Sequence, residues 1–189
     1  MNRLAPIAAL LAGACGSATD DRPATLDYIT ETILAPTCAA AECHSAFKQQ
    51  VGDVFDTVEN TRRSMVVNGL VFAEDADDPA SSFLIRTLTV GTPSILSPGS
   101  GNVRMPFVSP MPDGDIKLIE TWIRAGVPGA QCLPNAQNRG CQAVTITVGG
   151  QSLTNYNVVE CNDGNAGAVI QACSGTQICD SRSGNGECK

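Results

Sequence analysis

The stretch Cys38-Ala39-Ala40-Ala41-Glu42-Cys43-His44 places two cysteines close together, and the only histidine of the chain directly follows the second. Covalent haem attachment needs this arrangement, because each thiol can add to one vinyl group of the porphyrin while the imidazole binds the iron. The usual motif has two residues between the cysteines and this one has four, a longer loop that can still bring both sulfurs to the porphyrin edge. The stretch therefore predicts one covalent haem c, held by Cys38, Cys43 and His44.

The nine cysteines leave a second interpretation open. With haem, they divide into one N-terminal cysteine, two thioethers and three disulfides; without haem, into one N-terminal cysteine and four disulfides. In the second case Cys38 and Cys43 form a small disulfide, and His44 is a surface residue beside it. The downstream sequence favours haem, because it supplies the other parts that a haem site needs.

The first 14 residues have the pattern of an export signal. Arg3 precedes the apolar run Leu4 to Leu11, which is too short to remain in a membrane as a spanning helix. The following Leu11-Ala12-Gly13-Ala14-Cys15 resembles a bacterial lipobox, which implies a diacylated Cys15 at the mature N-terminus. Ordinary signal-peptide cleavage after Ala14 is the alternative, and we favour lipidation because an unpaired thiol outside the cell is a liability. We therefore expect a lipid-anchored protein on the periplasmic or cell-surface side of a bacterial membrane.

Charge and composition exclude some partners. The net charge is −7, and nucleic-acid binding needs the opposite sign. The densest acidic cluster, between Glu74 and Asp78, is interpreted as a solvated turn rather than as a docking surface for a basic redox partner. Aromatic residues make up only 4% of the chain, so a buried porphyrin would add much of the missing apolar area to the core.

Four helices are predicted before residue 130. Thr25 caps the first, which runs to about Ala35 and is stopped by Pro36. The second runs from about Thr57 to Val67, and Asp78-Pro79 begins the third. The last runs from about Gly114 to Ala125, has Asp113 as its cap and carries Trp122 on its apolar face, where we expect a core role.

The segment 91–112 has no helical period and contains two candidate iron ligands, Met105 and Met111. A second histidine ligand within one molecule is impossible, so a neutral thioether is the natural sixth ligand. Met65 falls on the apolar side of a predicted helix and is assigned to the core. The residues by themselves leave Met105 and Met111 both open, as well as a sixth position that is empty or bound by water.

A known family has these pieces in this order. Residues 26–129 resemble a monohaem class I cytochrome c domain, most closely that of planctomycete-type and myxobacterial lipoprotein cytochromes. The matching stretches are Ile33-Leu34, Cys38…Cys43-His44, Asp78-Pro79-Ala80-Ser81-Ser82-Phe83-Leu84, Arg104-Met105-Pro106 and Ile119-Glu120-Thr121-Trp122-Ile123-Arg124-Ala125-Gly126. The resemblance implies that Cys38 and Cys43 carry the thioethers, that His44 is the proximal ligand, and that Met105 rather than Met111 is the distal ligand.

Residues 130–189 differ in composition, being rich in Gly, Asn and Ser and poor in large apolar residues. Such a segment needs disulfides to hold it. Short strands are predicted at Ala143 to Val148, Tyr156 to Cys161 and Val169 to Cys173. The Asn162-Asp163-Gly164-Asn165 stretch is interpreted as a turn rather than a calcium site. The six disulfide candidates are Cys132, Cys141, Cys161, Cys173, Cys179 and Cys188.

The sequence thus predicts a mainly α fold, with a small helical domain around a covalent haem and a disulfide-rich β module after it. The expected divisions are a signal peptide at 1–14, a tether at 15–24, a cytochrome c-like domain at 25–129 and a Cys-rich module at 130–189. The expected function is electron transfer to and from redox partner proteins, without enzymatic activity. The alternatives are a haem enzyme or gas sensor with an open sixth site, and a haem-free surface lipoprotein.

Overall fold

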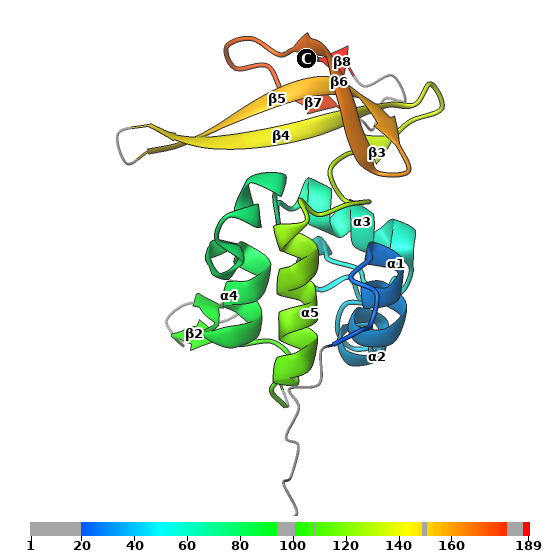
Figure 1. Cartoon of the computed structure of the whole chain (residues 1–189), viewed down its shortest axis with the longest axis vertical. Helices are drawn as coiled ribbons and strands as arrows, with labels where there is room; N and C mark the ends of the chain where they lie inside the picture. The colour runs from blue at the N-terminus through cyan, green and yellow to red at the C-terminus, as the bar shows by residue number, and fades with distance from the viewer. Residues whose placement is uncertain (1–19, 94–100, 108, 149–150, 181–186) are drawn as a thin grey trace, which may run out of the picture.

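The computed structural model describes residues 20–93, 101–107, 109–148, 151–180 and 187–189. Helices occupy the first part of the chain and antiparallel strands the last part, and the sheet lies across one end of the helical part (Figure 1). The structure is 35% helical with 24% strand, so the prediction of a mainly α fold is wrong. The fold is mixed, because the helices are short and three of the strands are longer than the sequence pattern predicted.

The first helical run leads directly into the Cys38–His44 stretch. It consists of α1 (Leu26–Ile29), a π-helical segment η1 (Thr30–Leu34) and α2 (Ala35–Cys38). Thr25 caps it as predicted, since its hydroxyl accepts a hydrogen bond from the backbone N–H of Tyr28 at 3.3 Å. The predicted stop at Pro36 is wrong. Pro36 lies in the first turn of α2, after the wider π turn, where its missing N–H and its ring are tolerated.

The next helices agree with the prediction in position but differ at their starts. α3 (Val58–Val67) is capped by Thr57, which accepts from the N–H of Asn60 at 3.2 Å. Asp78-Pro79 begins only the 3₁₀ turn η4 (Pro79–Ser81), and Ser82 is the residue that caps α4 (Phe83–Thr89). Two other 3₁₀ turns are η2 (Gln50–Gly52) and η3 (Ala73–Ala76).

The last helix, α5 (Asp113–Arg124), begins one residue earlier than predicted, so Asp113 is its first residue rather than its cap. Its apolar face forms the centre of the helical core, and Trp122 is fully buried with its indole N–H donating to the carbonyl oxygen of Pro128 at 3.0 Å. Arg22 pairs with Asp115 of this helix at 2.6 Å, which fixes the start of the described chain to α5. The other fully buried large side chains of this core are Ile29, Ile33, Leu34, Met65, Ile85, Ile119, Ile123 and Val127.

The sheet is antiparallel, with its strands in sequence order. It contains β3 (Leu133–Pro134), β4 (Arg139–Val148), β5 (Gln151–Asn162) and β6 (Asn165–Ala172). The predicted strands at 143–148 and 156–161 are parts of β4 and β5, which are ten and twelve residues long. Two small pairs complete the strands: β1 (Thr92–Pro93) with β2 (Asn102–Val103), and β7 (Cys179–Asp180) with β8 (Glu187–Cys188).

Three disulfides connect the strands of this part of the chain, as predicted. They join Cys132 to Cys161, Cys141 to Cys179, and Cys173 to Cys188. Disulfides persist in oxidising compartments, so the pairs indicate an extracellular-type environment. In the described part of the chain, no helix has the length and the apolar character that crossing a membrane requires.

The β5–β6 turn joins the sheet to the helical part. Asp163 and Gly164 at its centre both have positive φ, at 50° and 79°, so the Asn162–Asn165 stretch forms a tight hairpin turn. The carbonyl oxygen of Gly164 accepts from the N–H of Gln131 at 2.7 Å. Arg62 of α3 donates from Nε to the carbonyl oxygen of Gly129 at 2.7 Å. The N–H of Gly129 in turn donates to the side-chain oxygen of Asn165 at 2.8 Å, and this bond links the helical part to the β5–β6 turn.

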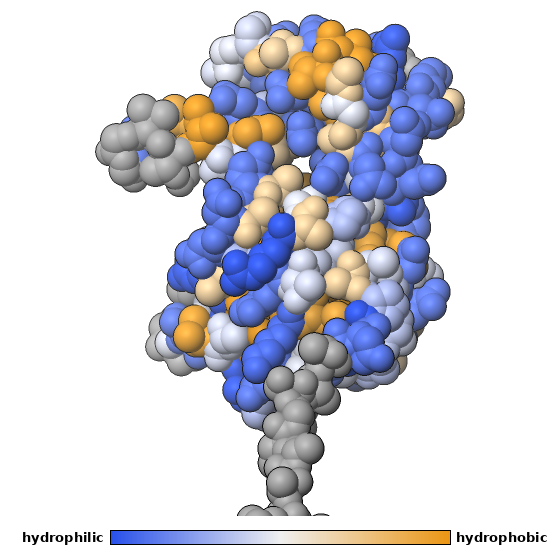
Figure 2. All heavy atoms as spheres, viewed as in Figure 1, coloured by the Kyte–Doolittle hydropathy of each residue, from blue (hydrophilic) through white to orange (hydrophobic). Residues whose placement is uncertain are grey.

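Apolar side chains remain exposed on the sheet. Figure 2 shows them over the sheet and along the β4–β5 hairpin, which extends past the helical part. The exposed side chains include Ile146, which faces Leu153 across the hairpin, and Val169 and Ile170 of β6.

Candidate functional site

One apolar cavity in the helical part is lined by Cys38, His44 and Met105. These residues come from the end of α2, from the loop after it, and from the segment that follows β2. The cavity contains about 870 Å³ of empty space, including the part that is open to solvent. The remaining lining residues are Leu34, Val51, Asp53, Phe55, Leu70, Phe83, Leu84, Thr87, Leu88, Thr92 and Val103.

The two cysteines of the stretch have different surroundings. Cys38 is 9% exposed, and burial raises the pKa of its thiol above the ordinary value. Cys43 is exposed and is not among the residues that line the cavity. The two sulfurs are not bonded to each other. The structure therefore brings Cys38 to the cavity and leaves Cys43 at the surface, because the four-residue spacer forms a turn of its own.

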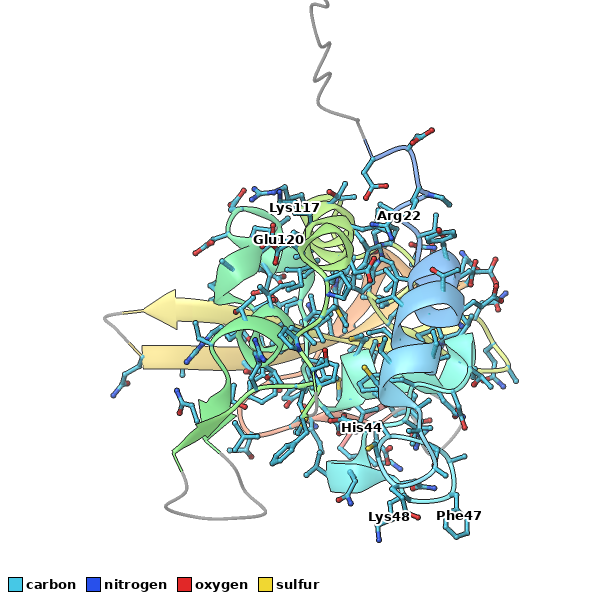
Figure 3. All side chains as sticks on the ribbon, turned by 90° about the horizontal axis from the view of Figure 1, so that it is seen from below. Arg22, His44, Phe47, Lys48, Lys117 and Glu120 are labelled. Carbon is cyan, nitrogen blue, oxygen red and sulfur yellow. A yellow bond between two sulfur atoms is a disulfide. The ribbon has the colours of Figure 1, made fainter. Side chains whose placement is uncertain are left out.

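His44 is held in one orientation by the loop that follows it. Its Nδ1 lies 3.3 Å from the carbonyl oxygen of Asp53, so the tautomer that donates from Nδ1 leaves the lone pair of Nε2 free. A metal-binding histidine commonly has this arrangement, since the second hydrogen bond fixes the ring. The ring of Phe55 packs beside the imidazole with a centroid distance of 5.3 Å. In Figure 3, His44 lies inside the loop, whereas Phe47 and Lys48 of the same loop point outward.

Asp53 is fixed by contacts with α3. Its carboxylate accepts a hydrogen bond from the side-chain amide of Asn68 at 2.6 Å. Burial raises the pKa of this carboxyl above its ordinary value, while the bond from Asn68 and the neighbouring His44 act in the opposite direction. Asn68 directly follows α3, and within α3 the hydroxyl of Ser64 accepts from the N–H of Val54 at 2.8 Å. Helix α3 therefore positions the carbonyl group that orients His44.

The two candidate methionines lie in different environments. Met105 is half-buried and lines the cavity, and its N–H donates to the carbonyl oxygen of Thr87 at 2.9 Å. Met111 is 3% exposed and packs in the helical core, outside the cavity lining. Of the two candidates, only Met105 lines the cavity.

Sequence reasoning missed two residues of the site. Asp53 contributes through its backbone carbonyl, which no side-chain pattern reveals. Thr87 has a buried hydroxyl without a hydrogen-bond partner among the described residues, and it lines the cavity. Helical spacing could have found Thr87, because it lies one turn after Phe83 and shares a face of α4 with Leu84 and Leu88.

The cavity has donors that suit a haem group. An imidazole with a free nitrogen, a thioether and a buried thiol surround an apolar space, and one buried hydroxyl there has no partner. These are the ligand types that bind haem iron and attach the porphyrin. The exposed position of Cys43 is the one feature that does not match attachment at both thiols.

Comparison of the chain with protein-family models, with curated proteins and with solved structures gives no match.

Proposed function

We propose that the protein is an electron-transfer cytochrome of the c type, with one covalent haem in this cavity. The observation that carries the proposal is that Met105, which is distant in the sequence from Cys38 and His44, lines the same apolar cavity as they do. When bound, haem would supply an iron that changes between the ferric and ferrous states.

In this proposal the protein's own residues bind and shield the group. Nε2 of His44 and the sulfur of Met105 are the iron ligands, and both are neutral. Neutral ligands and an apolar wall make the added positive charge of ferric iron less favourable, so they raise the reduction potential. In this proposal the thiol of Cys38 forms one thioether, and attachment at Cys43 requires the surface turn 41–44 to move toward the cavity.

The oxidising environment that the disulfides indicate is compatible with haem attachment outside the cytoplasm. We propose that a lipid on Cys15 anchors the protein to a membrane there, and that redox proteins are its partners. Cys15 lies outside the described residues.

The test is to produce the exported chain together with haem-attachment machinery and to record its intact mass and visible spectrum. One haem mass per chain, with a low-spin spectrum and a sulfur-to-iron charge-transfer band, is the expected result. A high-spin spectrum would instead favour the enzyme or gas sensor with an open site. A colourless protein with a Cys38–Cys43 disulfide would contradict the proposal and leave the haem-free lipoprotein.

Replacing His44 with Ala should abolish the low-spin spectrum, because the chain has no other imidazole. The matched control is Lys48→Ala, an exposed residue of the same loop whose side chain points outward in Figure 3. A normal low-spin spectrum in the His44 variant would show that the proximal ligand is assigned wrongly.

A further inference from the structure

The hydroxyl of Thr87 is a buried polar group that no other described residue satisfies. Several other helical threonines direct this group to the carbonyl oxygen four residues earlier, as Thr89 of the same helix does to Ile85 at 2.7 Å. Thr87 makes no such bond and instead lines the cavity. A buried hydroxyl without a partner destabilises the fold, so a partner that is present only in the ligand-bound protein would remove this cost.

The backbone connects Thr87 to Met105. The N–H of Met105 donates to the carbonyl oxygen of Thr87 at 2.9 Å, which holds the two residues together, and both line the same cavity. Other polar groups of the wall already have partners: Nδ1 of His44 contacts the carbonyl of Asp53, and the Asp53 carboxylate binds Asn68. The thioether sulfur is a hydrogen-bond acceptor, although a weak one. It belongs to the cavity residue whose backbone N–H is bonded to Thr87.

We propose that Thr87 is a positioning residue, whose hydroxyl donates a hydrogen bond to the sulfur of Met105 when that sulfur binds the haem iron. This inference rests on the proposed function. The bond would hold the sulfur in place and withdraw electron density from it. A sulfur that donates less electron density stabilises ferric iron less. The hydrogen bond would therefore favour the reduced, ferrous state.

The experiment measures the reduction potential of haem-loaded Thr87→Val, which has the same shape without the hydroxyl. The potential should fall, so that at a fixed applied potential the ratio of ferrous to ferric protein drops roughly threefold to tenfold. Thr87→Ser should restore the wild-type ratio. The control is Thr61→Val in α3, because the hydroxyl of Thr61 is also buried without a described partner but does not line the cavity. This control should leave the ratio unchanged.

The outcomes separate this inference from the proposed function. A wild-type chain without haem would overturn both. A wild-type chain with the sulfur-to-iron band, combined with a wild-type potential in Thr87→Val, would overturn only the role of Thr87. An equal shift in Thr61→Val would also overturn it, since the effect would then come from the core in general.

A measurement on the wild-type protein covers the case in which Thr87→Val does not take up haem. In the ferrous, diamagnetic protein, NMR should detect a slowly exchanging hydroxyl proton of Thr87 with a through-space contact to the Met105 methyl group. The absence of that contact would overturn the proposal.

Discussion

At the scale of single residues, the site depends on side chains whose environments differ although their sequence neighbourhoods look alike. Cys38 and Cys43 belong to one short stretch, yet one thiol is buried at the cavity and the other is exposed. Met105 and Met111 belong to one loop, yet only Met105 lines the cavity. Residue type and spacing identified all four as candidates. They did not show which residue of each pair lies at the cavity, because burial depends on contacts with distant parts of the chain.

The methionines give a paired prediction at this scale. Met105→Ala should remove the sulfur-to-iron band and lower the reduction potential, with a small loss of apoprotein stability because the side chain is half-buried. Met111→Ala should keep the band but lower the free energy of unfolding by about 2–5 kcal/mol, since it leaves a cavity in the core. Visible spectra, potentiometry and denaturant unfolding measure both variants. If the band disappeared in Met111→Ala and remained in Met105→Ala, Met111 would be the ligand.

Asp56 gives a pH-dependent prediction. Its carboxylate accepts hydrogen bonds from Asn60 at 2.8 Å and from the N–H of Ala46 at 3.0 Å, and chiefly the bond from Asn60 lowers its pKa below the ordinary 3.8. The unfolded chain therefore binds a proton more readily than the folded chain. The stabilisation is present above pH 3.8 and is lost as the pH falls through the lower folded value.

The measurement compares the thermal midpoints of wild type and Asp56→Asn from neutral pH down to strongly acidic pH. Wild type should be more stable at neutral pH, by less than about 1 kcal/mol because the carboxylate is partly solvated. The difference should shrink in acid. A difference that grows as the pH falls would contradict this account.

At the scale of elements, the residues where helices begin and end depend on local backbone geometry. Sequence patterns describe this geometry only in part. Thr25 caps α1 as predicted, since capping depends on nearby backbone groups. The run from Leu26 continues past Pro36 because of the intervening π turn, which no periodicity of apolar residues signals. The continuation places Cys38 at the end of α2, where the Cys38–His44 stretch begins.

The β5–β6 turn provides a prediction at this scale. A Cβ on Gly164 would lie 2.0 Å from the carbonyl oxygen of Gly129, a backbone atom that cannot move aside cheaply. Gly175 also has positive φ, but a Cβ there meets nothing within 4 Å. Gly175→Ala should cost about 1 kcal/mol from backbone strain alone. Gly164→Ala should cost about 1–3 kcal/mol more, as measured by denaturant unfolding of the oxidised protein. Equal costs would mean that the junction contributes little to stability.

At the scale of the whole molecule, the start of the described chain and the sheet lie at opposite ends. Arg22 is fixed to Asp115 in the first turn of α5, and the sheet lies across the other end of the helical part (Figure 1). If Cys15 is lipidated as proposed, the helical part with its cavity lies between the membrane and the disulfide-bonded sheet.

The anchor gives a prediction for the whole molecule. Cys15→Ser should release the exported protein from the membrane fraction, because the acyl chains attach to that sulfur. The disulfides and the haem spectrum should not change, since residue 15 precedes every described contact. Fractionation followed by intact-mass measurement tests this. Membrane retention of the variant would contradict lipid anchoring.

The sequence by itself determined the candidate ligands, the paired state of the six C-terminal cysteines and the positions of most helices, because these depend on residue chemistry and on short-range periodicity. Tertiary structure alone decided that Cys38, His44 and Met105 share one cavity, that Asp53 orients the imidazole and that Cys43 stays exposed. It also decided the balance of helix and sheet. These features arise from packing and from backbone hydrogen bonds between distant segments, which the order of residue types does not specify.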